Sequence, residues 1–413
     1  MLLPLGLLAA AAAEEPSSTF SSAELVELMP YVGNGFLATH PIVGARGGVA
    51  GAYAGQTIFL GGVFNAGQFS QNRSHRAAIP GFSTEVAPPS GAAAETTVEY
   101  ELDVRRAVLS RRWAAGSLTV TEEHYAHRTR RNLLVHTIAL ENRGPALQLG
   151  VSQRSGPECG GPYGCDVSLS ALPGNAGVRL LNGSTLESET PESPLTTIAM
   201  ASTTLPKQLR LGAGANRTLL LLSSLSSSLE SSQPVDTATR ALSEGTAAGA
   251  QQLLAEHAQA WSVLWESGAE VEGDEGLACA INGSLYFILS SIRDDWDFGL
   301  SPGGLASGGY HGHTFWDQET WMWPPLLMWH PDLARSALRY RFNRRAAATE
   351  LANHYGHVGL RFPWESALTG VEAETGSYGH SGRKDDLAGC SVWEIHISVS
   401  AALPDRSVVS RTD

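Results

Sequence analysis

The run TVEYELDV, residues 97–104, alternates apolar with polar side chains along its whole length. A period of two puts the apolar side chains on one face of a β-strand and the polar ones on the other. Residues 118–121 and 134–140 continue the pattern, with Gly, Pro and Ser clusters between the runs. Because no helical period intervenes, we expect an antiparallel β-sandwich over residues 24–235.

The hydrophobic period changes after the Ser-rich segment that ends at Pro234. From Ala241 to Ser267 apolar residues recur every three or four positions, as on one face of a helix, and Gly268 ends the pattern. Two further helical patterns cover residues 277–292 and 331–351, and the second begins at a proline. The order predicts a linker helix region over residues 236–272 and a helical domain that begins at residue 273.

The composition limits the classes of function. Of the 413 residues, 43% are hydrophobic, which is enough for packed cores and excludes a disordered chain. The 41 acidic and 28 basic residues give a net charge of −13 without a basic stripe, so nucleic acid is not expected as a partner. Lysine Schiff-base chemistry has only Lys207 and Lys384 to draw on, and no apolar run of membrane-spanning length follows the N-terminus.

The N-terminus and the cysteines bear on the compartment. Residues 1–13 read as a possible signal peptide, although a buried N-terminal element or a misassigned start codon would look the same. Cys159 and Cys165 either close a small disulfide loop or are buried thiols, and no cysteine spacing indicates a zinc site. Four glycosylation sequons lie at Asn72, Asn182, Asn216 and Asn282. We therefore expect a secreted or lysosomal protein, with the cytoplasm as the alternative.

The densest group of chemistry-bearing residues is YHGHTFWDQETWMWPP, residues 310–325. Aromatic faces that stack on sugar rings, beside carboxylates that accept hydrogen bonds from hydroxyls, suit a sugar subsite; a buried Trp-rich core layer is the alternative. His311 and His313 lack a third ligand at a useful spacing, so we expect hydrogen-bonding loop histidines and no metal. Asp317 and Glu319 would point about 200° apart on a helix, so at most one enters a pocket and the other is a cap or a salt-bridge partner.

A second group is FPWESA, residues 362–367. Here Glu365 follows Trp364 and Pro363, and it is either an N-terminal charge of a helix or an acceptor for sugar hydroxyls. The Gly-rich residues 301–309 lack the phosphate-loop signature, and the nucleophile elbow G-x-S-x-G is absent from the sequence. We therefore expect no cofactor.

Several of these stretches resemble glycoside hydrolase family 65. They are GLSPGGL (299–305), YHGHTFWDQETWMWP (310–324), MWHPDLAR (328–335), FPWESALTGVE (362–372) and, upstream, HAQAWSVLW (257–265). The resemblance covers residues 30–400 and implies an N-terminal antiparallel β super-sandwich, linker helices and the first part of an (α/α)6 barrel. The partial barrel would occupy residues 273–403, followed by a divergent tail over residues 404–413.

The resemblance also implies a substrate site. Trp316 and Asp317 match the pair that holds the non-reducing glucosyl unit, and Trp364 and Glu365 match a second wall of the same pocket. The family's general acid lies far downstream of this motif, in a sequence context that the chain lacks. We therefore expect a truncated chain whose catalytic acid and base lie beyond its end. Truncation would expose the apolar helix faces at Leu285, Ile288, Leu333 and Ala337.

The activity implied by the resemblance is that of an inverting α-glucosidase. The favoured substrate is glucosyl-galactosyl-hydroxylysine of collagen-type glycans, so the expected partner is a glucosylated disaccharide or a collagen-derived glycan. A trehalase or disaccharide phosphorylase relative is one alternative. A catalytically inactive carbohydrate-binding or interaction product is the other, and the sequence favours no particular oligomeric state.

Overall fold

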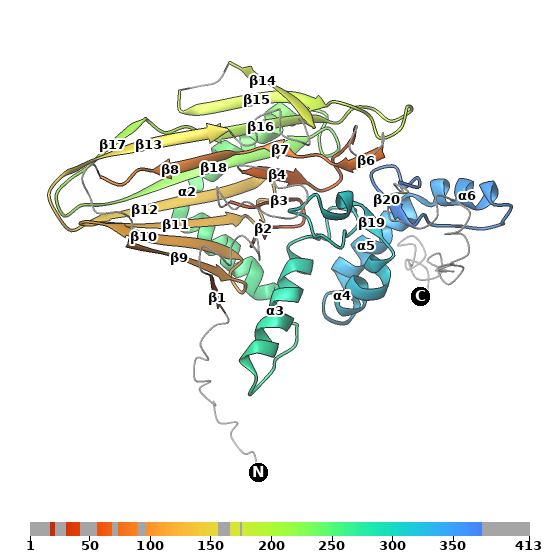
Figure 1. The fold of residues 1–413 in the computed structure, drawn as a ribbon. Helices are drawn as coiled ribbons and strands as arrows, with labels where there is room; N and C mark the ends of the chain where they lie inside the picture. Colours follow the sequence, from red (N-terminus) through yellow and green to blue (C-terminus); the bar gives the residue numbers. More distant parts are fainter. Residues whose placement is uncertain are drawn as a thin grey trace, which may run out of the picture.

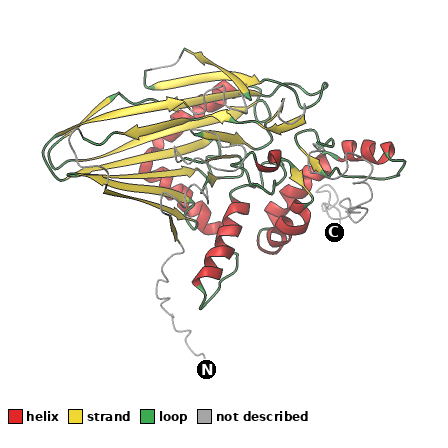
Figure 2. Cartoon of the chain, in the orientation of Figure 1, coloured by secondary structure: helices red, strands yellow, loops and turns green. Residues whose placement is uncertain are grey.

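The computed structural model describes residues 17–20, 30–41, 56–67, 73–89, 96–155, 166–173 and 176–373. Antiparallel strands occupy the first part of this range and helices the later part (Figures 1 and 2). Some expectations fall outside the described residues: the signal peptide (1–13), the sequon at Asn72, Cys159, Cys165, the C-terminal barrel segment (374–403) and the tail (404–413).

The largest sheet has nine strands, and all its neighbouring pairs are antiparallel. Their spatial order is β1 (Ser17–Phe20), β9 (Thr96–Asp103), β10 (Val108–Ala115), β11 (Leu118–Ala126), β12 (Leu133–Asn142), β18 (Asn216–Ser227), β16 (Thr197–Thr203), β15 (Val178–Thr185) and β14 (Val167–Leu172). The strands predicted at residues 97–104, 118–121 and 134–140 are therefore confirmed.

Among the described residues before Pro234, three smaller antiparallel sheets accompany the large one. They are β17 (Gln208–Leu211) with β13 (Leu147–Ser155) and β8 (Phe82–Val86); β2 (Val32–Gly33), β3 (Leu37–Thr39), β4 (Thr57–Leu60) and β7 (Ile79–Pro80); and β5 (Phe64–Gly67) with β6 (Arg73–Arg76). Alternation along β11 and β12 explains the packing. Leu118 and Ile138 bury against the three-stranded sheet, and Leu134 buries against the four-stranded sheet.

The opposite face of the nine-stranded sheet is covered by helix α2 (Pro234–Leu264) (Figure 1). Leu242 and Leu253 of this helix pack on Leu133 and Val135 of β12. The helix begins seven residues before the predicted Ala241, at a proline suited to a first turn, and it is interrupted at Gly249, where φ is 76°. The central strands β12 and β18 are thus packed on both faces.

The later helices are α3 (Glu275–Leu289), α4 (Trp323–Trp329), α5 (Pro331–Asn343) and α6 (Arg345–His354). Asp274 caps α3 by accepting the Leu277 N–H at 2.9 Å. The helix predicted to run continuously from residue 331 to 351 is divided at Arg344, where φ is −111°. Among the described residues, none of the helices is both long and apolar enough to cross a bilayer.

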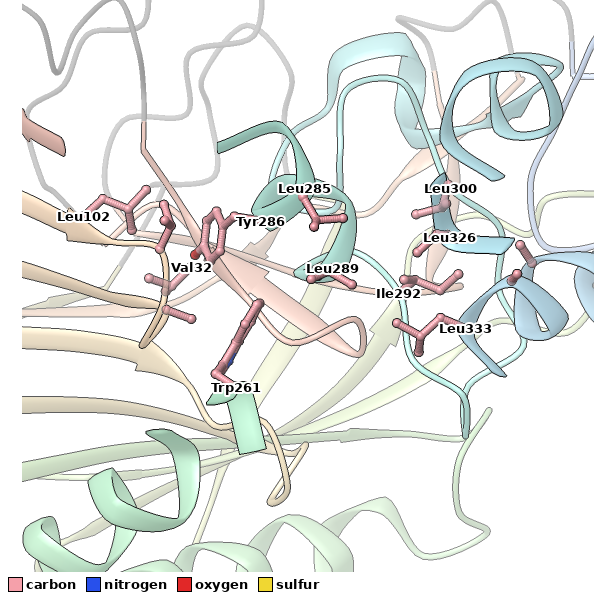
Figure 3. Close-up of a cluster of buried hydrophobic side chains, with 14 of the residues drawn as sticks. Val32, Leu102, Trp261, Leu285, Tyr286, Leu289, Ile292, Leu300, Leu326 and Leu333 are labelled. Carbon is pink, nitrogen blue, oxygen red and sulfur yellow. The ribbon is translucent and has the colours of Figure 1, made fainter. Parts of the chain in front are cut away.

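The expectation of bare helix faces is wrong for three of its four residues. Leu285, Leu333 and Ala337 are 3%, 5% and 0% exposed, and Ile288 packs partly buried against the same cluster. Figure 3 shows these helices meeting the β part around Trp261 of α2 and Val32 of β2. Side chains of β2, β9 and α2 therefore cover the apolar faces of these helices. Strongly exposed apolar residues of the helical part include Leu277, Trp321, Leu327, Met328 and Val358 instead.

Two buried arginines join the helices to the strands. Arg128 follows β11, and its Nη1 donates to the carbonyl oxygens of Asn34, Leu289 and Ile292 at 3.0, 2.9 and 3.2 Å. Arg293 donates to the carbonyl oxygen of Arg128 at 2.5 Å. Burial lowers the pKa of Arg128 to about 9, which still leaves the guanidinium charged at neutral pH.

His257 anchors α2 at the same junction. It is fully buried, its Nδ1 accepts the Arg128 N–H at 3.1 Å, and its Nε2 lies 3.4 Å from the carbonyl oxygen of Ala107. Burial, reinforced by the nearby His127, lowers the pKa of His257 to about 3. The histidine is therefore neutral in the folded chain.

Acidification should destabilise the fold through His257. A histidine whose pKa is lower in the folded than in the unfolded state stabilises the fold above its unfolded pKa, and this contribution is lost as pH falls. The loss at His257 amounts to about 2 kcal/mol at pH 5. His257→Asn keeps an acceptor for the Arg128 N–H but takes up no proton, so urea unfolding should show about 2 kcal/mol less loss between pH 7 and pH 5 than in the wild type. His354→Asn, on an exposed position of α6, is the control and should follow the wild type.

Candidate active site

A two-stranded ribbon brings the two Trp-carboxylate motifs together. β19 (Thr314–Phe315) pairs antiparallel with β20 (Glu365–Ser366), with Phe315 opposite Glu365. The residues that follow β19 and precede β20 are thereby neighbours: the rings of Trp316 and Trp364 lie 6.0 Å apart at 54°. Trp321 is 6.2 Å from Trp316 and is 65% exposed, so three indoles from two chain segments gather at one surface.

A buried arginine of α5 holds the backbone segments that carry these indoles. Arg341 donates from Nε and Nη2 to the two carboxylate oxygens of Glu319 at 2.8 and 3.0 Å. It also donates to the carbonyl oxygen of Phe315 at 3.0 Å and to Ser366 Oγ at 3.3 Å. Burial alone would lower the pKa of Arg341, but the charge of Glu319 and its hydrogen bonds more than compensate and raise it. One guanidinium thus braces both strands and the following turn.

Asp317 and Glu319 have different environments, as the sequence predicts. Both carboxylate oxygens of Glu319 are bound by Arg341, which confirms that one of the two carboxylates is a salt-bridge partner. Asp317 is half-buried and directly precedes η3 (Gln318–Met322), a single π-helical turn of the kind often found at functional sites. Partial burial, together with the charge of Glu319, raises the pKa of Asp317 above its usual range.

Glu365 lies in a strand and not at the start of a helix, so the helix-charge interpretation is wrong. Its side chain is fully buried, and Oε2 lies 2.9 Å from Nδ1 of the equally buried His313. His313 Nε2 donates to the carbonyl oxygen of Ser74 in β6 at 2.6 Å. The prediction that His313 is a hydrogen-bonding loop histidine is confirmed, and Glu365 faces this histidine.

Glu372 is a residue whose role the sequence did not indicate. Its carboxylate oxygens accept the backbone N–H groups of Trp364 and Glu365 at 2.8 and 3.2 Å. The carboxylate closes the turn between β20 and residue 373 and so orients the indole of Trp364. The chain contains no signal for this contact beyond a glutamate seven residues after Glu365.

The Gly-rich segment before β19 is held by the β part of the molecule. Arg76 of β6 donates from Nη1 to the carbonyl oxygens of Gly304 and Leu305 at 2.5 and 3.0 Å, and from Nη2 to that of Gly312 at 2.9 Å. Between Leu305 and Gly312, the residues Tyr310 and His311 have positive φ values of 54° and 55°, which residues other than glycine rarely adopt. Backbone strain of this kind is typical of functional loops.

The arrangement suits a polyol or sugar ligand. Indole faces provide apolar area for the C–H face of a pyranose, and the half-buried carboxylate of Asp317 provides a charged acceptor for hydroxyl groups. Three of the four predicted site residues, Trp316, Asp317 and Trp364, are partly exposed and adjacent. The fourth, Glu365, lies behind them in the interior.

Comparison with known families agrees with this chemistry. Residues 284–403 match the Glycosyl hydrolase family 65 central catalytic domain, a range that contains both Trp-carboxylate motifs. This segment of the chain is therefore similar to part of a family 65 catalytic domain. It is 34% identical over 376 residues to the protein-glucosylgalactosylhydroxylysine glucosidase of Dictyostelium discoideum, an alignment that covers 84% of this chain and 48% of that relative.

Two further comparisons extend this relationship. The kojibiose hydrolase of Flavobacterium johnsoniae is 40% identical over 176 residues, which cover 41% of this chain and 26% of that relative. The solved structure of a proposed kojibiose phosphorylase from the human microbiome has a similar fold, with a TM-score of 0.71 and 14% identity over 88% of this chain and 53% of that one. The chain spans about half the length of the curated glucosidases that it matches.

Removing the Arg341 guanidinium should unfold the site. Arg341→Met leaves the buried carboxylate of Glu319 without its counter-charge, so the free energy of unfolding should fall by about 3–5 kcal/mol in a urea titration. The matched control is Arg335→Met, because Arg335 pairs with Asp332 at 2.8 Å on the solvent side of the same helix. Exposed pairs contribute about 0–1 kcal/mol. Equal losses in the two variants would contradict the bracing role of Arg341.

Proposed function

We propose that this chain is part of a glycosidase that removes an α-linked glucosyl unit, with glucosyl-galactosyl-hydroxylysine of collagen-type glycans as the favoured substrate. The observation that carries the proposal is the convergence of Trp316, Asp317 and Trp364 at the β19–β20 ribbon, within the segment that matches the family 65 catalytic domain. The names of the relatives add the substrate class: glucosidases of glucosylgalactosylhydroxylysine and kojibiose hydrolases.

The proposed architecture follows the family. Residues 24–235 form the β super-sandwich, residues 236–272 the linker helix region and residues 273–403 the first part of an (α/α)6 barrel. The observed order of antiparallel sheets followed by helices supports it. A secretory or lysosomal location is part of the proposal and rests on residues 1–13 and on the exposed sequon at Asn216. Asn282, by contrast, is buried in α3 and is unsuited to glycosylation as folded.

Each site residue has a proposed role. Trp316 and Trp364 stack on the non-reducing glucosyl ring, and Asp317 accepts hydrogen bonds from its hydroxyls. Glu365 completes the wall from behind, where its contact with His313 fixes the strand that directly follows Trp364. Inverting hydrolysis needs one carboxylic acid at the leaving oxygen and one carboxylate that activates water. We assign neither role to Glu319 or Glu372, because each binds protein groups with both oxygens.

Substrate binding tests the role of Asp317. Titration of the chain with kojibiose or with glucosyl-galactosyl-hydroxylysine should quench the indole fluorescence of the site. Asp317→Asn should weaken binding by about 10- to 100-fold, because hydrogen bonds to a charged acceptor contribute about 1.5–3 kcal/mol. Asp332→Asn, on the solvent side of α5, should leave the affinity unchanged. Unaltered affinity in Asp317→Asn would exclude its contact with the sugar.

Glucose release tests the assignment of the catalytic groups. A general acid and a general base each contribute roughly 10²–10⁴ in rate. Incubation of the chain with trehalose, kojibiose and glucosyl-galactosyl-hydroxylysine should release no glucose above background. Turnover that Glu365→Gln or Glu372→Gln abolishes would instead identify a catalytic acid inside the chain and overturn the proposed division of roles.

A further inference from the structure

A polar cluster interrupts the apolar inner face of the nine-stranded sheet. Along β11, Leu118 and Val120 belong to the core under the three-stranded sheet, and Ala126 belongs to the core under the four-stranded sheet. Glu122 and His124 lie between them on the same face. They occupy positions that apolar side chains fill on either side.

The neighbouring strand adds a second histidine. His136 of β12 is directly opposite His124, and their imidazole rings stack with centroids 3.9 Å apart. Both rings direct Nε2 toward the same carboxylate oxygen: Oε2 of Glu122 lies 3.1 Å from Nε2 of His136 and 3.9 Å from Nε2 of His124. All three potential ligand atoms lie within 4.8 Å of one another.

These separations match a tetrahedral metal. Zinc binds imidazole nitrogen and carboxylate oxygen at about 2.0–2.1 Å, so neighbouring ligand atoms on a tetrahedron are about 3.3 Å apart. The observed 3.1 and 3.9 Å bracket this edge. The stacked imidazoles must rotate about their side-chain bonds to direct both Nε2 lone pairs at one ion, while the paired strands hold their backbones in place.

Neighbouring side chains orient the carboxylate of Glu122, as is usual for carboxylates that bind metals. Its second oxygen, Oε1 of Glu122, accepts hydrogen bonds from Arg111 Nη1 at 2.8 Å and from Trp113 Nε1 at 3.3 Å. Such outer contacts fix a ligating carboxylate in a monodentate orientation and leave the other oxygen for the ion. Arg111 thus binds the carboxylate oxygen other than the one next to the histidines.

The donor set suits a divalent cation. One carboxylate oxygen and two imidazole nitrogens are ligand types that zinc accepts.

A cavity borders His124 and His136, and part of its lining is polar, including Thr39 of β3, Thr84 of β8 and Gln153 of β13. A two-histidine, one-carboxylate set leaves one tetrahedral position open, which a water molecule can occupy.

We propose that Glu122, His124 and His136 form a zinc-type metal site inside the β region, separate from the sugar site. The sequence expectation of no metal considered cysteine spacing and the pair His311 and His313. It did not consider histidines twelve residues apart, which only strand pairing brings together. A bound ion would link β11 to β12 at the centre of the sheet, so its role is structural.

Metal binding by the tag-free, chelator-treated 413-residue chain tests the site. Titration with Zn²⁺ should give one ion per chain and raise the melting temperature, because an ion that binds only the folded state stabilises it. Co²⁺ should produce the intense visible absorption of a four-coordinate ion. His124→Ala and His136→Ala should each weaken Zn²⁺ binding at least tenfold and abolish the Co²⁺ spectrum.

The controls separate the metal site from a hydrogen-bonded cluster. His354→Ala, on exposed α6, should bind Zn²⁺ like the wild type. If the alanine variants fail to fold, His124→Asn and His136→Asn preserve polarity at both positions and should fold without binding. Absence of a one-to-one Zn²⁺ complex in the folded wild-type chain, or binding that survives substitution of both histidines, would overturn the proposal.

Discussion

Charged guanidinium groups that donate to main-chain carbonyl oxygens hold the helices of this protein on its strands. Arg128 and Arg76 are buried, and their partners are carbonyl oxygens of Leu289, Ile292, Gly304 and Gly312. A buried cation is costly unless several acceptors surround it, so the backbone must present its carbonyls at the right places. Because an unsatisfied buried cation is so costly, the observed docking, which surrounds these guanidinium groups with carbonyl oxygens, is favoured over dockings that do not.

The candidate sugar site depends on the same junction. His313 links the carboxylate of Glu365 to the backbone of β6, so the ribbon under Trp316 and Trp364 is tied to the first sheets of the chain. Arg341 ties it to α5 from the other side. The ribbon next to the exposed indoles is therefore held by contacts with the strands and with the helices. Such a support limits the movement of the aromatic surface and preserves its fit to a rigid ring.

The sequence predicted what depends on local periodicity and composition. The alternating strands, the approximate helices and the contrast between Asp317 and Glu319 all follow from spacing along the chain. It could not predict the pairing of β19 with β20, because two-residue strands leave no periodic signal. It also misplaced the buried faces of α3 and α5, since their partners at Val32 and Trp261 are distant in sequence. The cross-strand histidines were missed for the same reason.

The grip of Arg76 on the Gly-rich segment has a kinetic consequence. Its acceptors at Gly304, Leu305 and Gly312 lie 228, 229 and 236 residues after Arg76 in the sequence. Contacts between such remote segments form slowly, because a long loop must close before they stabilise anything. During synthesis the strands emerge well before this segment. The Arg76 guanidinium therefore stays solvated until the carbonyl oxygens that it binds have been synthesised. The segment that precedes the candidate site is then expected to be among the last parts to become ordered, and misfolding of the early sheets would also disturb it.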